Sequence, residues 1–175
     1  MAGVRQLEHV GLCVTDLESA IQFCTDTMGL VEYARNDGGV YLGCGLDGNF
    51  DLALVEGGTG VDHFALRADE RQFREYLDAL DEHGIATEQT DGTEPGQKQG
   101  VKFDLPTGSL TMEIVTVEET RYHNPADVDA LPTTAPVEPR RSPIAPVDLS
   151  HITAMTPDPK RDVEFLRDVL DLHVS

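Results

Sequence analysis

Lysine, tryptophan and cysteine are scarce in this 175-residue chain. It has three lysines, three cysteines and no tryptophan. The scarcity of lysine leaves 32 acidic residues against 13 basic ones, so the formal net charge is −19 at pH 7. A chain with this balance lacks the basic surface that holds nucleic acid or anionic lipid, and we expect neither as a partner.

Long hydrophobic runs are also missing. Apolar stretches extend over only a few residues, far short of the roughly 20 that cross a bilayer, and the N-terminal sequence has no apolar signal core. The cysteines, Cys13, Cys24 and Cys44, form neither a CxxC pair nor zinc-type spacing, so we expect them reduced and mostly buried. With 39% hydrophobic residues, the composition predicts a soluble, cytoplasmic, globular protein.

The acidic residues are scattered along the chain and do not form one tail. Salt screens the self-repulsion that such a charge causes in dilute buffer, so the pattern predicts a halophilic protein. A surface that only keeps the protein soluble is the alternative interpretation.

One short pattern, apolar–polar–His–apolar–small, occurs three times. It reads LEHVGL at 7–12, VDHFAL at 61–66 and LSHITA at 149–154. The third copy extends its match to the first through the segment that follows, without a gap. We therefore interpret the chain as a tandem repeat.

Each of the first two copies opens a strand–helix–three-strand unit. In the first, Asp16 is the expected N-cap and Gly29 ends the helix; in the second, Asp69 and Gln72 form a capping box. Expected strands follow the helices at 30–34, 40–44 and 50–55, and at 85–89, 101–105 and 110–117. The fold class predicted is α+β, with tandem βαβββ units forming a curved mixed sheet and the helices outside.

The expected domain organisation has three parts. Residues 1–117 form the paired domain, with units at 7–56 and 61–117, and 118–148 form a linker that holds six of the ten prolines. Residues 149–175 begin a third unit, of which we expect the first strand and the helix. Because its apolar face has no partner, we expect this unit to dock on a second copy of the chain, giving a homo-oligomer such as a dimer, or to be poorly ordered.

Strand alternation decides which way the repeated histidines point. In the first strand Val10, Leu12 and Val14 face the helix, so His9 faces away; His63 and Glu113 follow the same rule in the second unit. Two imidazoles and one carboxylate on one concave face would suit non-haem Fe(II), with Mn(II) as a substitute. A relic set lining an unused cavity is the alternative.

The tandem units, with His in the first strand and Glu in the last, resemble the vicinal oxygen chelate superfamily, which includes glyoxalase I, bleomycin and fosfomycin resistance proteins and extradiol dioxygenases. The segments LEHVGLCVTDLESAIQF, FDLPTGSLTMEI and LSHITAMTPDPKRDVEFLRDVLDL are most similar to two-domain enzymes of the catechol 2,3-dioxygenase kind. The resemblance covers 7–117 and 149–175. Glyoxalase I is less similar, because Ala53 occupies the position of one of its carboxylate ligands.

This resemblance implies an Fe(II)-dependent enzyme that opens a catechol beside its diol, with His9, His63 and Glu113 as metal ligands. In the two-domain relatives the working metal lies in the second domain, so the chain is expected to be the N-terminal portion of a longer enzyme. His151 would then be a ligand only if a fourth unit were supplied. The alternatives are a non-catalytic small-molecule binding or dimerisation module and a glyoxalase-type lyase.

The remaining candidates carry weaker expectations. His83, before Gly84, is expected to cap a helix C-terminus. The loop predicted at 91–100 is either a lid over the cavity or a series of turns. No pattern selects an acid–base residue among the four tyrosines, and His123 and His173 have no mechanistic case.

Overall fold

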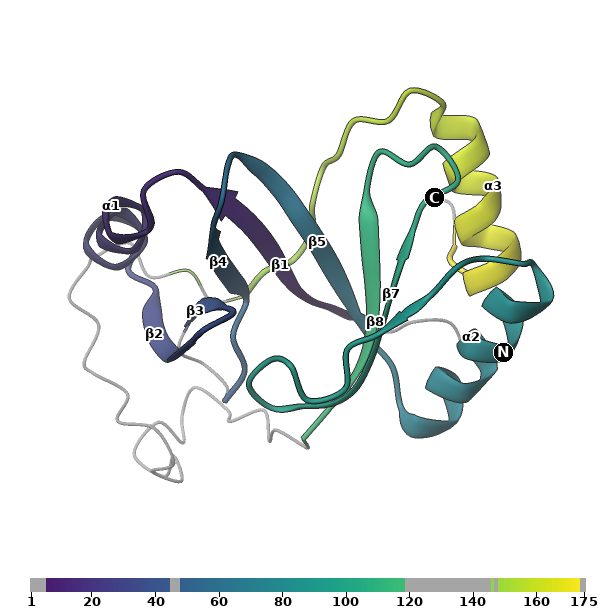
Figure 1. Cartoon of the computed structure of the whole chain (residues 1–175), viewed down its shortest axis with the longest axis horizontal. Helices are drawn as coiled ribbons and strands as arrows, with labels where there is room; N and C mark the ends of the chain where they lie inside the picture. Colours follow the sequence, from purple (N-terminus) through teal and green to yellow (C-terminus); the bar gives the residue numbers. More distant parts are fainter. Residues whose placement is uncertain (1–5, 45–47, 119–145, 147, 174–175) are drawn as a thin grey trace. The chain divides into compact units, whose positions relative to one another are not determined.

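The computed structural model describes residues 6–44, 48–118, 146 and 148–173 (Figure 1). Its elements, in chain order, are β1 (Gln6–Val14), α1 (Leu17–Gln22), the π-helical turn η1 (Phe23–Met28), β2 (Val31–Asn36), β3 (Gly39–Gly43), β4 (Leu52–Glu56), β5 (Gly60–Arg67), α2 (Glu70–Glu82), β6 (Glu88–Gln89), β7 (Gln97–Asp104), β8 (Thr111–Val117) and α3 (Pro159–Leu170).

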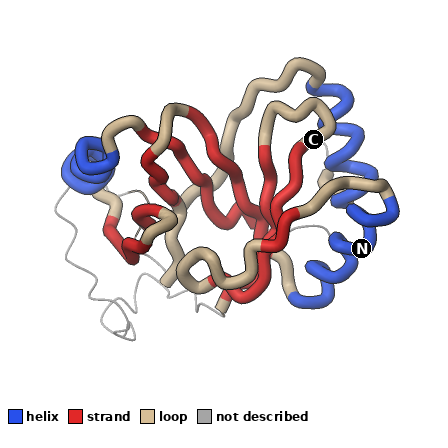
Figure 2. Tube along the Cα trace, viewed as in Figure 1, coloured by secondary structure: helices blue, strands red, loops and turns tan. Residues whose placement is uncertain are grey.

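These elements belong to two compact units. The His9 unit contains the described residues from His9 to Val61 together with 146 and 148–150, and the His63 unit contains 6–8, 62–118 and the described residues from His151 onward. Each unit has one strand, a helical segment and then three strands, and α3 follows in the His63 unit. Figure 2 colours these helices and strands.

The His9 unit begins with a capped helix, as the sequence predicts. The Asp16 side chain accepts a hydrogen bond from Ser19 N at 3.0 Å, and Gly29 ends the helical segment with φ of 78°. A regular α-helix was expected over this whole span, but its second half is the π-helical turn η1. At Gly29 the left-handed backbone explains the choice of glycine.

Four strands of the His9 unit pair in the order β2, β3, β4, β1. Strand β1 pairs in parallel with β4, whereas β3 pairs antiparallel with both β2 and β4. On the helix side, Ile21 and Cys24 pack with a buried apolar cluster from the strands. On the opposite side, Tyr41, Phe50 and Ala53 form a second buried cluster.

The His63 unit repeats this pairing. Strand β5 pairs in parallel with β8, while β7 pairs antiparallel with both β8 and β6. Helix α2 starts at the predicted capping box, in which the Asp69 side chain accepts from Gln72 N and the Gln72 side chain accepts from Asp69 N. The amphipathic stripe of α2 buries Phe73, Tyr76 and Leu80.

Both units therefore contain the predicted strand, helix and three strands, with mixed pairing. The predicted α+β class is confirmed. The predicted loop at 91–100 is wrong in its second half, because β7 begins at Gln97 and pairs with Val117 of β8. The polar, glycine-containing sequence from Gln97 to Gly100 lacks a strand-like pattern, and the ladder with β8 overrides it.

Helix α3 packs within the His63 unit, beside α2 (Figure 1). Val169 and Leu170 are 2% and 0% exposed, and the Phe165 ring centre lies 6.1 Å from that of Phe103. Buried Asp162 accepts hydrogen bonds from Thr107 N at 3.2 Å and Thr107 Oγ1 at 2.8 Å. The expectation that this helix is poorly ordered is therefore wrong, because its own chain covers its apolar face; docking on a second copy stays a prediction.

The expected first strand of the third unit is also wrong. Residues 148–158 contain no strand. In the other two units the opening strand pairs in parallel with the closing strand, and no described residue supplies a closing strand for the third repeat. The segment therefore lacks the parallel ladder that β1 and β5 form with their closing strands.

Most of the predicted linker, 118–148, lies outside the described residues, as do His123 and Tyr122. Among the described residues, no helix is both long and apolar enough to cross a membrane.

Candidate metal centre

Two neighbouring strands of the His63 unit place a histidine and a glutamate together. His63 lies on β5 and Glu113 on β8, and the parallel register pairs Glu113 with Ala65, two residues beyond His63. Because side chains alternate along a strand, His63, Ala65 and Glu113 share one face. Both ionisable side chains are fully buried, at 1% and 0% exposed.

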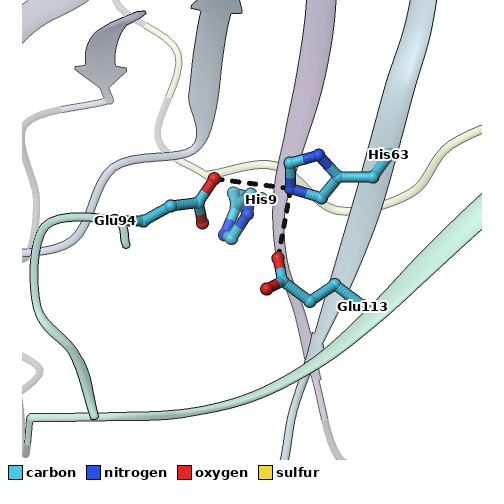
Figure 3. A group of neighbouring side chains, drawn as sticks. All are labelled: His9, His63, Glu94 and Glu113. Atoms are coloured by element: carbon cyan, nitrogen blue, oxygen red, sulfur yellow. Dashed lines mark ion pairs between the residues drawn. The ribbon is translucent and has the colours of Figure 1, made fainter. Parts of the chain in front are cut away.

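A second carboxylate approaches the same histidine from the loop between β6 and β7. His63 Nε2 lies 3.2 Å from Glu113 Oε2 and 3.5 Å from Glu94 Oε1 (Figure 3). One ligand-type atom from each of the three side chains lies within 4.8 Å of the others. Nitrogen and carboxylate oxygens at this spacing form a donor set for a divalent cation such as Fe(II) or Mn(II).

The other nitrogen of the His63 ring is held by a carboxylate. His63 Nδ1 lies 2.7 Å from Asp62 Oδ2, and Lys102 Nζ lies 3.7 Å from the same oxygen. An acceptor at Nδ1 assigns the proton to that nitrogen, which leaves the Nε2 lone pair of the neutral ring directed at Glu94 and Glu113. Histidines that bind metals are commonly oriented by a carboxylate in this way.

The pKa shifts of His63 and Glu113 favour a positive charge in the cluster. Burial works against charging the His63 ring, but its hydrogen bonds with Glu113 and Asp62 outweigh burial and raise the pKa of His63 above its ordinary value. Burial likewise favours a neutral Glu113, yet hydrogen bonds with His63 and Thr90 hold its pKa below the ordinary value. A proton on Nε2 supplies the charge between the carboxylates, and a metal cation could replace it.

Hydrogen bonds to the other carboxylate oxygen, Oε1, also hold Glu113 in place. Thr90 Oγ1 and Gln97 Nε2 both donate to Glu113 Oε1, the latter at 2.8 Å. Gly100 leaves the space for this contact, since a Cβ there would lie 2.8 Å from Glu113 Oε1 and closer still to Thr90 and Gln97. The donor set, the carboxylate on Nδ1 and this cradle fit a divalent metal site.

His9 belongs to the other unit. Its ring centre lies 4.4 Å from that of Phe50, on the face opposite the α1 cluster, as strand alternation predicts. Figure 3 also labels His9. His9 is buried, at 2% exposed. Its membership of a metal triad remains a prediction.

The other predicted residues lie elsewhere. His151 is exposed, in the segment that precedes α3. His83 is the C-cap of α2, with Nδ1 2.7 Å from Ala79 O, so its predicted capping role is confirmed. Ala53 is buried beside Tyr41 and Phe50.

Sequence reasoning missed Thr90, Glu94 and Gln97. They lie in or beside the stretch predicted as an irregular loop, where no periodicity marks a functional residue. Gly100 offered the only signal, since a glycine within a strand indicates a bulge or the close approach of another group. That signal does not say which group approaches.

No family model matches the chain, but comparison with known proteins finds similar sequences and structures. Metapyrocatechase from Geobacillus stearothermophilus is 31% identical over 172 residues, which cover 95% of this chain and 51% of that protein. The glutathione transferase FosA from Serratia marcescens is 25% identical over 130 residues, covering 68% of this chain and 92% of FosA.

A solved structure agrees with these matches. The 2,3-dioxygenase LapB from Pseudomonas sp. KL28 has a TM-score of 0.79 and 26% identity, covering 97% of this chain and 59% of LapB. These matches fit the vicinal oxygen chelate superfamily. It spans about half the length of metapyrocatechase and less than two thirds of LapB. Within this superfamily, repeated βαβββ units are the expected architecture, and both described units have it.

Proposed function

We propose that the chain is a metal-binding part of an extradiol ring-cleaving dioxygenase, of the catechol 2,3-dioxygenase type, which oxidises a small aromatic vicinal diol. One observation carries the proposal: the buried Nε2 of His63 faces two carboxylates while Asp62 occupies Nδ1. The similarity to metapyrocatechase and LapB supports the reaction class.

In this proposal His63 and Glu113 hold the metal together with His9 of the other unit. His9 and His63 are equivalent in the repeat, and both are buried. Two histidines and one carboxylate suit Fe(II), with Mn(II) as the alternative. When bound, such a metal supplies a Lewis acid and a template for the two oxygens of a diol.

The carboxylates around His63 have separate roles in this proposal. Asp62 keeps the Nδ1 proton in place, so that His63 offers Nε2 as the donor. A proton on His63 Nε2, which the raised pKa of His63 favours, would have to leave for a metal to bind, and Glu94 Oε1, 3.5 Å away, could accept it. Glu113 remains ionised and contributes the negative charge that attracts the cation.

The similarity also bears on His151. In the family resemblance His151 matches a ligand position of a third unit, and its use depends on a fourth unit, which the described residues do not supply. We therefore assign it no role in the cluster of the His63 unit.

Metal content tests the proposal. The protein, purified without oxygen in high salt, should bind about one equivalent of Fe(II), and His63→Ala should lose it while the matched capping variant His83→Ala retains it. The loaded wild type, given oxygen and catechol, should form a yellow ring-opened semialdehyde. Absence of bound metal in folded wild type would overturn the metal assignment, and bound iron with a colourless product would overturn the dioxygenase assignment.

A second function has support from one observation, the match that covers 92% of FosA. This chain would then be a small-molecule binding or dimerisation module of the glyoxalase and bleomycin resistance group, or a metal-dependent lyase. A binding module would retain its ligand after chelator treatment and in His63→Ala. A lyase would need a further ligand in place of Ala53.

A further inference from the structure

The two oxygens of Glu113 have different surroundings. Oε2 lies 3.2 Å from His63 Nε2, on the side where a metal would be bound. Oε1 accepts hydrogen bonds from the Thr90 hydroxyl and from Gln97 Nε2. The carboxylate is therefore held with one particular oxygen toward the histidine.

The orientation of the Gln97 amide follows from its neighbours. Glu113 when ionised can only accept hydrogen bonds, so the NH2 group of Gln97 must face it. At the other end, Gln97 Oε1 accepts from Thr93 N at 3.0 Å and from Thr93 Oγ1 at 3.2 Å. The reverse orientation would place acceptor against acceptor and donor against donor.

Through these contacts Gln97 joins the ligand carboxylate to the loop that carries Glu94. Its backbone N donates to Glu94 O at 3.2 Å, in addition to the side-chain bonds with Thr93. The side chain is 8% exposed. A buried amide with both ends engaged fixes the groups that it bonds.

We propose that Thr90 and Gln97 are positioning residues that restrict Glu113 to a single metal-binding oxygen, Oε2, and that Gln97 also fixes the Glu94 loop. The inference rests on the proposed metal function. A carboxylate can bind a metal through one oxygen or through both. Two donors on Oε1 favour the first mode, which leaves one more coordination position for water, substrate or oxygen.

Loss of these donors should change the metal site in a specific way. Without them, Oε1 can rotate toward the cation and become a second ligand atom, which removes a coordination position. A role limited to folding would change the stability of the protein but would not change the number of exchangeable waters on a bound metal.

The test uses the full chain loaded with Mn(II), with bound exchangeable water counted by water-proton relaxation and affinity measured by EPR titration. Thr90→Val and Gln97→Met remove the donors with little change of shape, and the double variant removes both. Thr87→Val and Gln89→Met are matched controls at exposed positions of the same unit. Thr90→Ser is a further control that keeps the hydroxyl.

We expect the double variant to hold about one water fewer than the wild type, with an affinity altered by about 10-fold to 100-fold. Thr90→Ser should behave as wild type. Amide exchange at Thr93 should accelerate in Gln97→Met and stay unchanged in Thr90→Val. Each single variant, checked for folding by circular dichroism, tests one donor if the double variant does not fold.

The outcomes separate the inference from the proposed function. If the folded wild type binds no Mn(II), the proposed metal function fails and the inference fails with it. If the wild type binds Mn(II) and the variants keep the water count and affinity of the controls, the positioning role is wrong and the metal function stands.

Discussion

Gly100 of β7 lies directly against the carboxylate of Glu113 on β8. A Cβ at Gly100 would lie 2.8 Å from Glu113 Oε1, and would also collide with Thr90 Oγ1 and Gln97 Nε2. The backbone of Gly100 has no positive φ. Glycine is therefore needed here because the carboxylate and its two donors occupy the space of a side chain. An unusual backbone conformation is not the reason.

Gly100→Ala should disturb the cluster, because the added methyl group must displace Glu113 or its donors. We expect Mn(II) affinity to fall at least about 10-fold and the free energy of unfolding to fall by about 1–3 kcal/mol. EPR titration and urea denaturation measure the two effects.

Gly38→Ala is the matched control. A Cβ at Gly38 would lie 3.1 Å from the ends of the Asn36 and Tyr41 side chains, in the His9 unit. These side-chain ends can move, so the change should leave metal affinity as in wild type. Wild-type affinity in Gly100→Ala would show that the cradle does not hold the ligand carboxylate.

Leu170→Ala tests the packing of α3 on its own chain. Leu170 is 0% exposed, and Phe165 of the same helix packs near Phe103 of β7. Truncation of a fully buried leucine costs about 2–5 kcal/mol, so urea denaturation should show a loss of this size.

Val163→Ala serves as the comparison on the same helix, because Val163 is 39% exposed. It should cost less than about 1 kcal/mol. Equal, small effects of the two substitutions at low protein concentration would contradict the packing of α3 within one chain.

The N-cap of α1 should titrate with pH. Hydrogen bonds from the Ser19 backbone N–H and hydroxyl hold the pKa of Asp16 below its ordinary value. Because the folded pKa is the lower one, the stabilising contribution is complete above the ordinary pKa and disappears as pH falls through the folded pKa.

An NMR titration of the Ser19 amide should report this directly. Its chemical shift should move with a midpoint below the ordinary aspartate value. Asp16→Asn, which keeps an acceptor but has no carboxylate, should remove the transition. A midpoint at or above the ordinary value would contradict the capping account.

Salt should stabilise the protein. The net charge of −19 produces self-repulsion, and the screening length falls from about 10 Å at 0.1 M to about 3 Å at 1 M salt. We expect Tm to rise by at least about 5 °C between 0.1 and 2 M KCl, which corresponds to roughly 1 kcal/mol or more. A Tm that stays constant or falls would remove the argument for adaptation to high salt.

Local signals in the sequence were enough to predict the two repeated units. Asp16, Gly29 and the capping box of Asp69 and Gln72 act through bonds and backbone angles of their immediate neighbours. Strand alternation predicted that His63 and Glu113 share a face, which the register of β5 with β8 confirms. These features depend on periods of two to four residues, which are visible without knowledge of distant contacts.

The sequence failed where a long-range partner decided the conformation. Residues 149–154 look like a strand, as 7–12 do, but the parallel closing strand that supports β1 has no counterpart among the described residues. Asp162 of helix α3 accepts a hydrogen bond from Thr107, which lies 55 positions earlier in the sequence. No local pattern could indicate that pairing.

By itself, the sequence determined the α+β units, the strand faces of His9 and His63 and the acidic character of the chain, since these follow from local geometry and composition. Only the tertiary structure decided that Glu94 reaches His63 and that Thr90 and Gln97 hold Glu113. These groups come from a loop and a strand end, and their positions depend on the ladder between β7 and β8. Hydrogen bonds across a folded sheet, and not the spacing of residues along the chain, bring them together.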